Sequence, residues 1–395
     1  MTRLNNQSAP QTTTTKILQI KTPKPIYWKQ VLITTSAVYP LLLLAGWFLR
    51  LVFPMEVLKQ EVTIFFMVLV VASLMVFPVM PFIMKFVGPW MHKRTGILDN
   101  SLNKKIESNI IATQSPLLDT KTVRLDKSGL NIRFAELGDK TKPPLILLHG
   151  VPENLQAWYA VAPLMAKQYN VFAIDWPGFG GSDPMTSTKD YTSLNFAEVV
   201  IDFLDSLQIQ KAILMATDIS LLPALLVGLK YPDRVLKLAV MDGIPFPRPQ
   251  YSSWELRSFA NKGSIIGKAL VEWFPKISAQ IAYFKGFYWG HSIPLEIRQE
   301  FSADGISKST QQAFLSYFQN FHISQQYFEE HVQEMKVPAL VIWGKNDRFI
   351  NPKLAYEIAE KLPNAKLEII DKAGHYIHMD KPQELVKVVS KFLKE

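Results

Sequence analysis

Short apolar runs recur along the second part of the chain, and stretches with helical periodicity lie between several of them. Residues 193–207 and 352–362 have the apolar spacing that is typical of helices. Strands that alternate with helices predict a mostly parallel sheet with helices on both faces, so the expected fold class is α/β. The runs expected to form its strands are residues 145–148, 171–174, 212–215, 235–241, 339–343 and 366–370.

Three turns directly after the first three runs contain residues capable of chemistry. They read His149-Gly150-Val151-Pro152, then Asp175-Trp176-Pro177-Gly178-Phe179-Gly180-Gly181-Ser182, then Ala216-Thr217-Asp218-Ile219-Ser220. In type and order these turns resemble those of the α/β-hydrolase fold family, over roughly residues 122–395. The resemblance implies a hydrolase core in two parts, residues 117–243 and 337–395, with a helical cap over residues 244–336.

The third turn matches the place where this family carries its nucleophile. The nucleophile occupies a strained turn between strand and helix, and the residues two before and two after it must be small. Around Asp218 these residues are Ala216 and Ser220, whereas around Ser220 they would be Asp218 and Leu222. We therefore predict that Asp218 is the nucleophile. The alternatives are a serine-type esterase acting through Ser220 and a simple helix-capping role for Asp218.

Two further turns supply the expected partners of this nucleophile. Asp347 lies in the turn after residues 339–343, where the aspartate of the family orients the histidine. Asp242 follows residues 235–241 and is the alternative acid, since some relatives carry it there. His375 follows the last apolar run, in the sequence Ala-Gly-His, and is the expected base.

A carboxylate nucleophile implies attack on an sp³ carbon and an ester intermediate. A water activated by His375 would hydrolyse this ester, with Asp347 orienting the histidine. The backbone N–H groups of Val151 and Ile219 are the expected oxyanion hole. A cis peptide bond is expected before Pro152. No cofactor or metal ion is expected.

The expected substrate is a small hydrophobic molecule. The turn at residues 149–154, with Trp158, is similar to that of epoxide hydrolases, which protonate the epoxide oxygen with cap tyrosines. Phe318 stands where the second such tyrosine is expected, so the neighbouring Tyr317 is the candidate cap acid. A haloalkane dehalogenase-like hydrolase is an alternative, although Ile219 replaces the halide-binding tryptophan of that family. A second alternative function is that of a non-catalytic, membrane-tethered binding protein.

The N-terminal part differs in composition from the hydrolase-like part. Residues 1–24 are polar and predict a disordered tail. Two apolar stretches, at about residues 31–53 and 62–84, are long enough to cross a bilayer core of roughly 30 Å. They predict a transmembrane α-hairpin over residues 25–94, followed by a linker over residues 95–116.

Charge and aromatic placement support a membrane anchor. Lys and Arg residues gather before the first predicted span and after the second, which predicts that both termini and the hydrolase domain are cytoplasmic. The formal net charge is +9, and without a nucleic-acid motif we expect a lipid bilayer as partner and no nucleic acid. Trp28, Tyr39-Pro40 and Trp90 resemble the membrane hairpin of some antibiotic-biosynthesis-monooxygenase proteins. The chain contains no cysteine, which excludes disulfides and a cysteine nucleophile.

Overall fold

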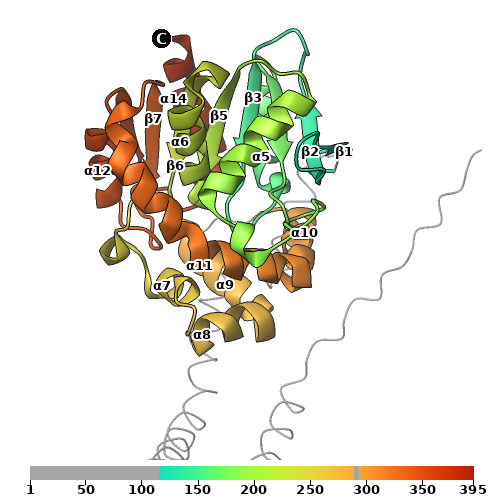
Figure 1. Ribbon diagram of the computed structural model, residues 1–395, viewed down its shortest axis with the longest axis vertical. Helices are drawn as coiled ribbons and strands as arrows, with labels where there is room; N and C mark the ends of the chain where they lie inside the picture. The colour runs from blue at the N-terminus through green and yellow to red at the C-terminus, as the bar shows by residue number, and fades with distance from the viewer. Residues whose placement is uncertain (1–114, 289–292) are drawn as a thin grey trace, which may run out of the picture. The chain divides into compact units, whose positions relative to one another are not determined.

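The computed structural model describes residues 115–288 and 293–395, which belong to one compact unit of the chain. An eight-stranded sheet forms its centre, in the order β1-β2-β4-β3-β5-β6-β7-β8 (Figure 1). Strand β2 runs antiparallel to both of its neighbours, β1 and β4. The remaining neighbours, β4-β3-β5-β6-β7-β8, all pair in parallel. The strands are β1 Thr120–Arg124, β2 Asn131–Leu137, β3 Pro144–Leu148, β4 Asn170–Ile174, β5 Ala212–Thr217, β6 Val235–Met241, β7 Ala339–Gly344 and β8 Ala365–Ile370.

Both faces of the sheet are buried by helices. Successive residues of a strand point to opposite faces, so Ile146 and Leu148 of β3 belong to one hydrophobic cluster, and Leu145 and Leu147 belong to another. The first cluster includes residues of α5 Ser193–Ser206, α6 Leu221–Lys230 and α12 Lys353–Lys361. The second includes residues of α4 Ala162–Met165 and α14 Pro382–Lys394. The predicted α/β fold with a mostly parallel sheet is confirmed.

The sequence reading missed strands β1 and β2. Strand β1 is exposed along most of its length, and β2 contains the charged residues Arg133 and Glu136 among its apolar ones. Strand β1 is at the edge of the sheet and β2 is next to it, and strands that solvent partly covers need no continuous apolar run. The predicted strand at residues 212–215 also continues to Thr217, directly before Asp218.

A group of helices lies between β6 and β7 in the chain, within the segment expected to form a cap. Figure 1 shows these helices together beyond one end of the sheet. They are α7 Trp254–Ala260, α8 Ile265–Lys268, the π-helical turn η6 Ala269–Trp273, α9 Pro275–Gly286, α10 Leu295–Ile306 and α11 Lys308–His331.

Within residues 115–288 and 293–395, no helix is long and apolar enough to cross a membrane. The predicted tail at residues 1–24, the predicted hairpin at residues 25–94 and the linker up to residue 114 lie outside the described residues.

Candidate active site

The predicted site residues follow the carboxyl ends of strands that lie beside one another. Val151 comes after β3, Asp218 after β5, Asp347 after β7 and His375 after β8. In parallel α/β sheets, ligands bind outside these strand ends. Segments far apart in the sequence therefore meet at one edge of the sheet, beneath the cap.

Asp218 occupies a strained turn between β5 and α6. It begins the short 3-10 helix η3 Asp218–Ser220, and its φ is 53°, in the left-handed region that residues other than glycine rarely adopt. Neighbouring glycines leave room for the turn: a Cβ atom at Gly150 would lie 2.7 Å from the Asp218 Cβ. A Cβ atom at Gly243 would lie 2.5 Å from the Leu221 Cβ. Such strain is typical of a nucleophile elbow.

Ser220, the alternative nucleophile, is fully buried. Its hydroxyl donates to the His149 carbonyl and accepts a hydrogen bond from Trp176 Nε1 at 2.7 Å. These two bonds use the hydroxyl to tie the elbow to the turns after β3 and β4. The geometry therefore favours Asp218 over Ser220 as the reactive side chain.

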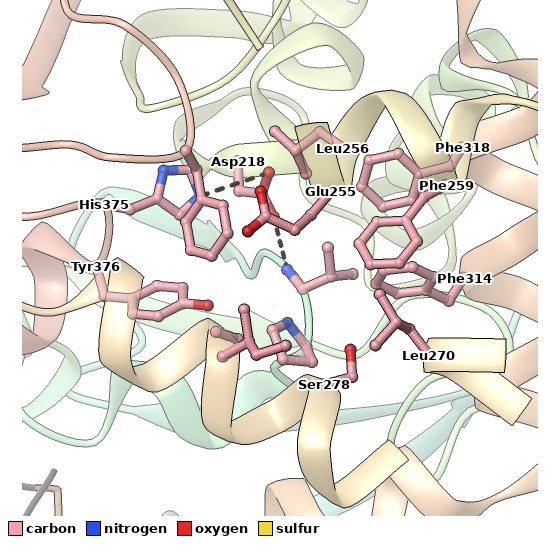
Figure 2. Close-up of a pocket in the computed structure, with 15 residues that line it drawn as sticks. Asp218, Glu255, Leu256, Phe259, Leu270, Ser278, Phe314, Phe318, His375 and Tyr376 are labelled. Atoms are coloured by element: carbon pink, nitrogen blue, oxygen red, sulfur yellow. Dashed lines mark hydrogen bonds and ion pairs between the residues drawn. The ribbon is translucent and has the colours of Figure 1, made fainter. Parts of the chain in front are cut away.

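The two carboxylate oxygens of Asp218 have different surroundings. Oδ2 accepts a hydrogen bond from the Val151 N–H at 2.8 Å, and Oδ1 lies 3.7 Å from His375 Nε2. Figure 2 shows both interactions at the wall of a cavity. The Val151–Pro152 peptide bond is cis, as expected. The structure thus brings one of the two predicted oxyanion-hole donors to Asp218, while the other, the Ile219 N–H, belongs to the next residue of the turn.

His375 lies between two carboxylates. Its Nδ1 is 2.9 Å from Asp347 Oδ2, and the other Asp347 oxygen accepts from the N–H groups of Phe349 and Ile350 at 2.7 and 3.0 Å. Burial alone would lower the pKa of His375, but Asp347 and Asp218 outweigh it and raise this pKa well above its ordinary value. In the resting site, His375 therefore favours its charged form.

Asp242, the alternative acid, has a different partner. Its Oδ1 accepts from the Gly344 N–H at 3.1 Å, and its Oδ2 has no hydrogen-bond partner in the part of the chain that the structure describes. Complete burial, together with the nearby charge of Asp347, raises the pKa of Asp242 well above its ordinary value. A neutral carboxyl cannot stabilise a histidine cation as Asp347 does, so the geometry favours Asp347 as the partner of His375.

The cap covers a mostly apolar cavity beside Asp218 and His375. Figure 2 shows Phe259, Phe314 and Phe318 on one side and Tyr376 on the other. Such a lining suits an uncharged, hydrophobic ligand. The lining residues are Val151, Pro152, Asp218, Glu255, Leu256, Phe259, Leu270, Ser278, Ile281, Ala282, Phe314, Phe318, Phe349, His375 and Tyr376.

Tyr317, the predicted cap acid, points its hydroxyl at the elbow backbone. The hydroxyl donates to the Ile219 carbonyl at 2.7 Å and lies 2.7 Å from the Ser193 hydroxyl. Burial raises the pKa of Tyr317 above its ordinary value. Phe318, and not Tyr317, lines the cavity beside Asp218 and His375. The Tyr317 proton is thus engaged in holding the elbow.

Tyr376 is a cavity residue that the sequence reading missed. It directly follows His375, and Figure 2 shows its hydroxyl turned into the cavity. Burial, with the charges of Glu153 and Asp218, raises the pKa of Tyr376 well above its ordinary value, so the phenol stays protonated. Its position next to the predicted base was the one available signal, because core tyrosines are common and no family motif marks this one.

Glu255 is a second unpredicted polar residue in the cavity wall. Both of its carboxylate oxygens lie 2.7 Å from Lys285 Nζ. Burial alone would raise the pKa of Glu255, but the bonds from Lys285 outweigh it and lower this pKa. The ion pair leaves Glu255 charged and compensated, which suits a structural link between α7 and α9.

Comparisons with known proteins agree with this geometry. Residues 143–382 match the alpha/beta hydrolase fold family, and residues 23–91 match the Y2318 C-terminal domain family. Epoxide hydrolase 4 of Homo sapiens is 29% identical over 289 residues, which cover 69% of this chain and 78% of that protein. A 2-hydroxy-6-oxononadienedioate/2-hydroxy-6-oxononatrienedioate hydrolase of Burkholderia vietnamiensis is 24% identical, over 72% of this chain and 98% of that protein.

Solved structures show the same fold. The crystal structure of Epoxide Hydrolase A from Mycobacterium thermoresistibile aligns with a TM-score of 0.59 at 21% identity, covering 70% of this chain and 98% of that one. The family match spans more than half of the chain. The chain is therefore a hydrolase, as expected, and it belongs to the α/β hydrolase fold family.

Proposed function

We propose that this chain hydrolyses epoxides of small hydrophobic molecules through an ester on Asp218. The observation that carries this proposal is the Asp218 carboxylate on a strained turn, at the wall of an apolar cavity and facing His375. The similarity to an epoxide hydrolase over most of the hydrolase-like part supports the choice of substrate class.

In the first step, Asp218 Oδ1 attacks one epoxide carbon and the C–O bond of the ring breaks. Oδ2, held by the Val151 N–H at 2.8 Å, becomes the carbonyl oxygen of the ester. The electron pair of the broken bond stays on the epoxide oxygen, which takes a proton from the Tyr376 hydroxyl. A phenol is a much stronger acid than an alcohol, so this transfer is favourable even with a raised pKa.

In the second step, His375 removes a proton from a water that attacks the ester carbonyl. Esterification first removes the Asp218 charge, one of the two charges that raise the His375 pKa, so the charged histidine gives its proton to the Tyr376 phenolate and is neutral when it acts as the base. The Val151 and Ile219 N–H groups stabilise the oxyanion. Collapse breaks the ester C–O bond, and the departing alkoxide takes the proton of the carboxyl group formed on Asp218. The diol leaves with Asp218 charged, His375 protonated and Tyr376 a phenol, as in the resting site.

Haloalkane hydrolysis is the alternative reaction for the same nucleophile. A halide leaves as an anion and needs N–H donors. Of the described residues that line the cavity, none is a tryptophan or an arginine that could hold a halide. The Tyr376 hydroxyl can protonate an alkoxide, so the site suits an epoxide better than a haloalkane. A binding protein without catalysis would have no use for the strained carboxylate or for the His375–Asp347 pair.

Covalent labelling tests the nucleophile. His375→Gln should accumulate an adduct of one substrate mass on Asp218 when the full chain is incubated with styrene oxide, as intact mass spectrometry measures. Asp218→Asn should show no adduct and no turnover. In wild type, one turnover in ¹⁸O-water should place the label in the Asp218 carboxylate. Turnover by Asp218→Asn at the wild-type rate would contradict the proposal.

Tyr376→Phe tests the proton donor. We expect ring opening to slow by roughly 10²–10⁴-fold, the usual contribution of general acid catalysis. The rate of adduct formation in the His375→Gln background measures this step alone. Tyr283→Phe is the matched control, because its buried hydroxyl does not line the cavity. Tyr317→Phe compares the acid expected from the sequence, and a larger loss there would return the role to Tyr317.

We also propose that residues 25–94 anchor the hydrolase domain in a membrane as a two-helix hairpin, with both termini in the cytoplasm. The length of the apolar stretches and the position of the flanking Lys and Arg residues support it. The proposed hairpin would resemble that of some antibiotic-biosynthesis-monooxygenase proteins. The chain should stay in the membrane fraction after alkaline carbonate washing. A C-terminal reporter that proves extracytoplasmic would overturn the orientation.

A further inference from the structure

The cap carries a cluster of exposed apolar side chains on consecutive elements. Ile265 and Ile266 of α8 are 76% and 60% exposed, and Trp273 of η6 is 64% exposed. Phe274, directly after η6, and Ile277 of α9 are each more than half exposed. Large apolar side chains are scattered singly on most proteins, so five within one short segment indicate a surface that binds something. We call these five residues the apolar cap surface.

Lysines alternate with these side chains. Lys262, Lys268 and Lys276 are all exposed, and the acidic residue of the segment, Glu272, lies 3.8 Å from Lys268. Helix α8 and η6 pack on each other and on α7 and α9, so the apolar and basic side chains share one end of the cap. Figure 1 shows α8 at the end of the cap that is remote from the sheet.

The composition distinguishes between two kinds of partner. Protein interfaces are depleted in lysine relative to the rest of the surface. Surfaces that lie in the headgroup region of a bilayer combine Trp, Phe and other apolar residues with Lys, because the apolar side chains enter the acyl boundary and the lysines meet anionic lipids. Trp in particular favours this region. Three exposed isoleucines, an exposed Trp and Phe, and three lysines match the second description.

The apolar cap surface is continuous with the wall of the active-site cavity. Leu270 of η6 and Ser278 of α9 line that cavity, and they bracket Trp273 in the chain. A neighbouring cavity, lined by Val271, Pro275 and Lys276 among others, lies against the same segment and shares Ser278 and Phe314 with the first. The segment that exposes the apolar side chains thus also forms part of the wall of both cavities.

We infer that the apolar cap surface inserts into the headgroup region of an anionic lipid bilayer, so that the active-site cavity takes its substrate from the membrane. The proposed contact between the apolar cap surface and the bilayer involves only residues that the structure describes. Its use for substrate entry rests on the proposed function, and the expected substrate is an epoxide on a long aliphatic chain dissolved in the bilayer.

Site-directed spin labelling tests the contact directly. Because the chain contains no cysteine, a single cysteine introduced as Ile266→Cys can be labelled uniquely in the full chain. The chain is reconstituted into vesicles of phosphatidylcholine and phosphatidylglycerol. Tyr356→Cys on α12, a residue 58% exposed on a helix that covers the sheet, is the matched control. We expect the label at 266 to be accessible to oxygen and protected from a water-soluble nickel chelate, and the label at 356 to show the reverse.

Equal accessibility of the two labels to the nickel chelate would overturn the inference, whether or not the chain remains anchored. Substrate entry has its own readout. In the double variant Ile265→Ser with Ile266→Ser, kcat/KM for a vesicle-dissolved long-chain epoxide should fall at least tenfold, while kcat/KM for styrene oxide in water stays unchanged. An equal loss on both substrates, or on neither, would contradict entry from the membrane. Absence of the Asp218 adduct with styrene oxide would instead contradict the proposed function.

Discussion

Gly286, the last residue of α9, sets the position of Tyr376. Its carbonyl accepts the His375 N–H at 2.6 Å, and its missing side chain makes room for the Tyr376 ring. A Cβ atom at this position would lie 2.7 Å from Cδ2 and 2.9 Å from Cζ of that ring, and closer still to Cε2. Contacts below 3.0 Å essentially never occur for real Cβ atoms, so Gly286→Ala forces the ring or the helix end to move.

The size of the displacement sets the expected effect. To reach ordinary contact the ring must retreat by about 1 Å, and overpacking of this kind costs about 1–3 kcal/mol. The ring has little free space, because its centroid lies 5.0 Å from that of Phe287 and 5.3 Å from that of His375. A misplacement of about 1 Å at a reacting group lowers rates by roughly 10²-fold, so ring opening should slow by about that factor.

Adduct formation on Asp218 in the His375→Gln background measures the rate, and urea unfolding measures the stability. Gly305→Ala on α10 is the matched control, since a Cβ atom there would meet nothing within 4 Å. It should leave the rate unchanged and stabilise the helix by roughly 0.5–1 kcal/mol. If Gly286→Ala keeps both the wild-type rate and the wild-type stability, the Tyr376 ring does not need its present position and the reasoning fails.

Three further changes separate the roles of the buried polar groups. Ser220→Ala should retain adduct formation and lose about 1 kcal/mol of stability. It removes both hydrogen bonds of the Ser220 hydroxyl, but Trp176 Nε1 still donates to the His149 carbonyl at 3.2 Å. Abolished turnover with unchanged stability would point to a serine nucleophile. Asp242 has a raised pKa, so its neutral carboxyl stabilises the fold fully below the unfolded pKa of roughly 3.9 and this contribution is lost as the pH rises toward the folded pKa. Asp242→Asn should therefore gain stability over wild type with rising pH, by at most about 1.4 kcal/mol per pH unit in urea unfolding. A difference that stays constant with pH would show that the pKa of Asp242 is the same in the folded and unfolded states. Hydrolysis of the Asp218 ester should slow as the pH falls through the pKa of His375 in the ester, while ring opening should not; rapid-quench mass spectrometry follows both steps, and a shared pH dependence would place the histidine in ring opening as well.

The core of the site could be predicted from the sequence because it obeys local rules. A nucleophile elbow requires small residues on either side, and Ala216 and Ser220 satisfy that requirement. Asp347 and His375 each lie in the turn after an apolar run, so the parallel topology brings them to the same edge of the sheet. The sequence alone left Asp347 and Asp242 as alternative acids. The structure distinguishes them, because Asp347 Oδ2 lies 2.9 Å from His375 Nδ1.

The proton donor could not be predicted in the same way, because the cap determines it. Residues 317 and 318 lie one step apart on a helix, where a rotation of about 100° decides which side chain faces the cavity. Packing between α11 and α5 turns Tyr317 toward the Ile219 carbonyl and Phe318 toward the cavity. Tyr376 reaches the cavity from the opposite side only because Gly286 lacks a side chain. A motif on one segment cannot reveal a position that depends on a glycine some ninety residues earlier. The position of the proton donor therefore follows only from the three-dimensional contacts between the cap and the turn after β8.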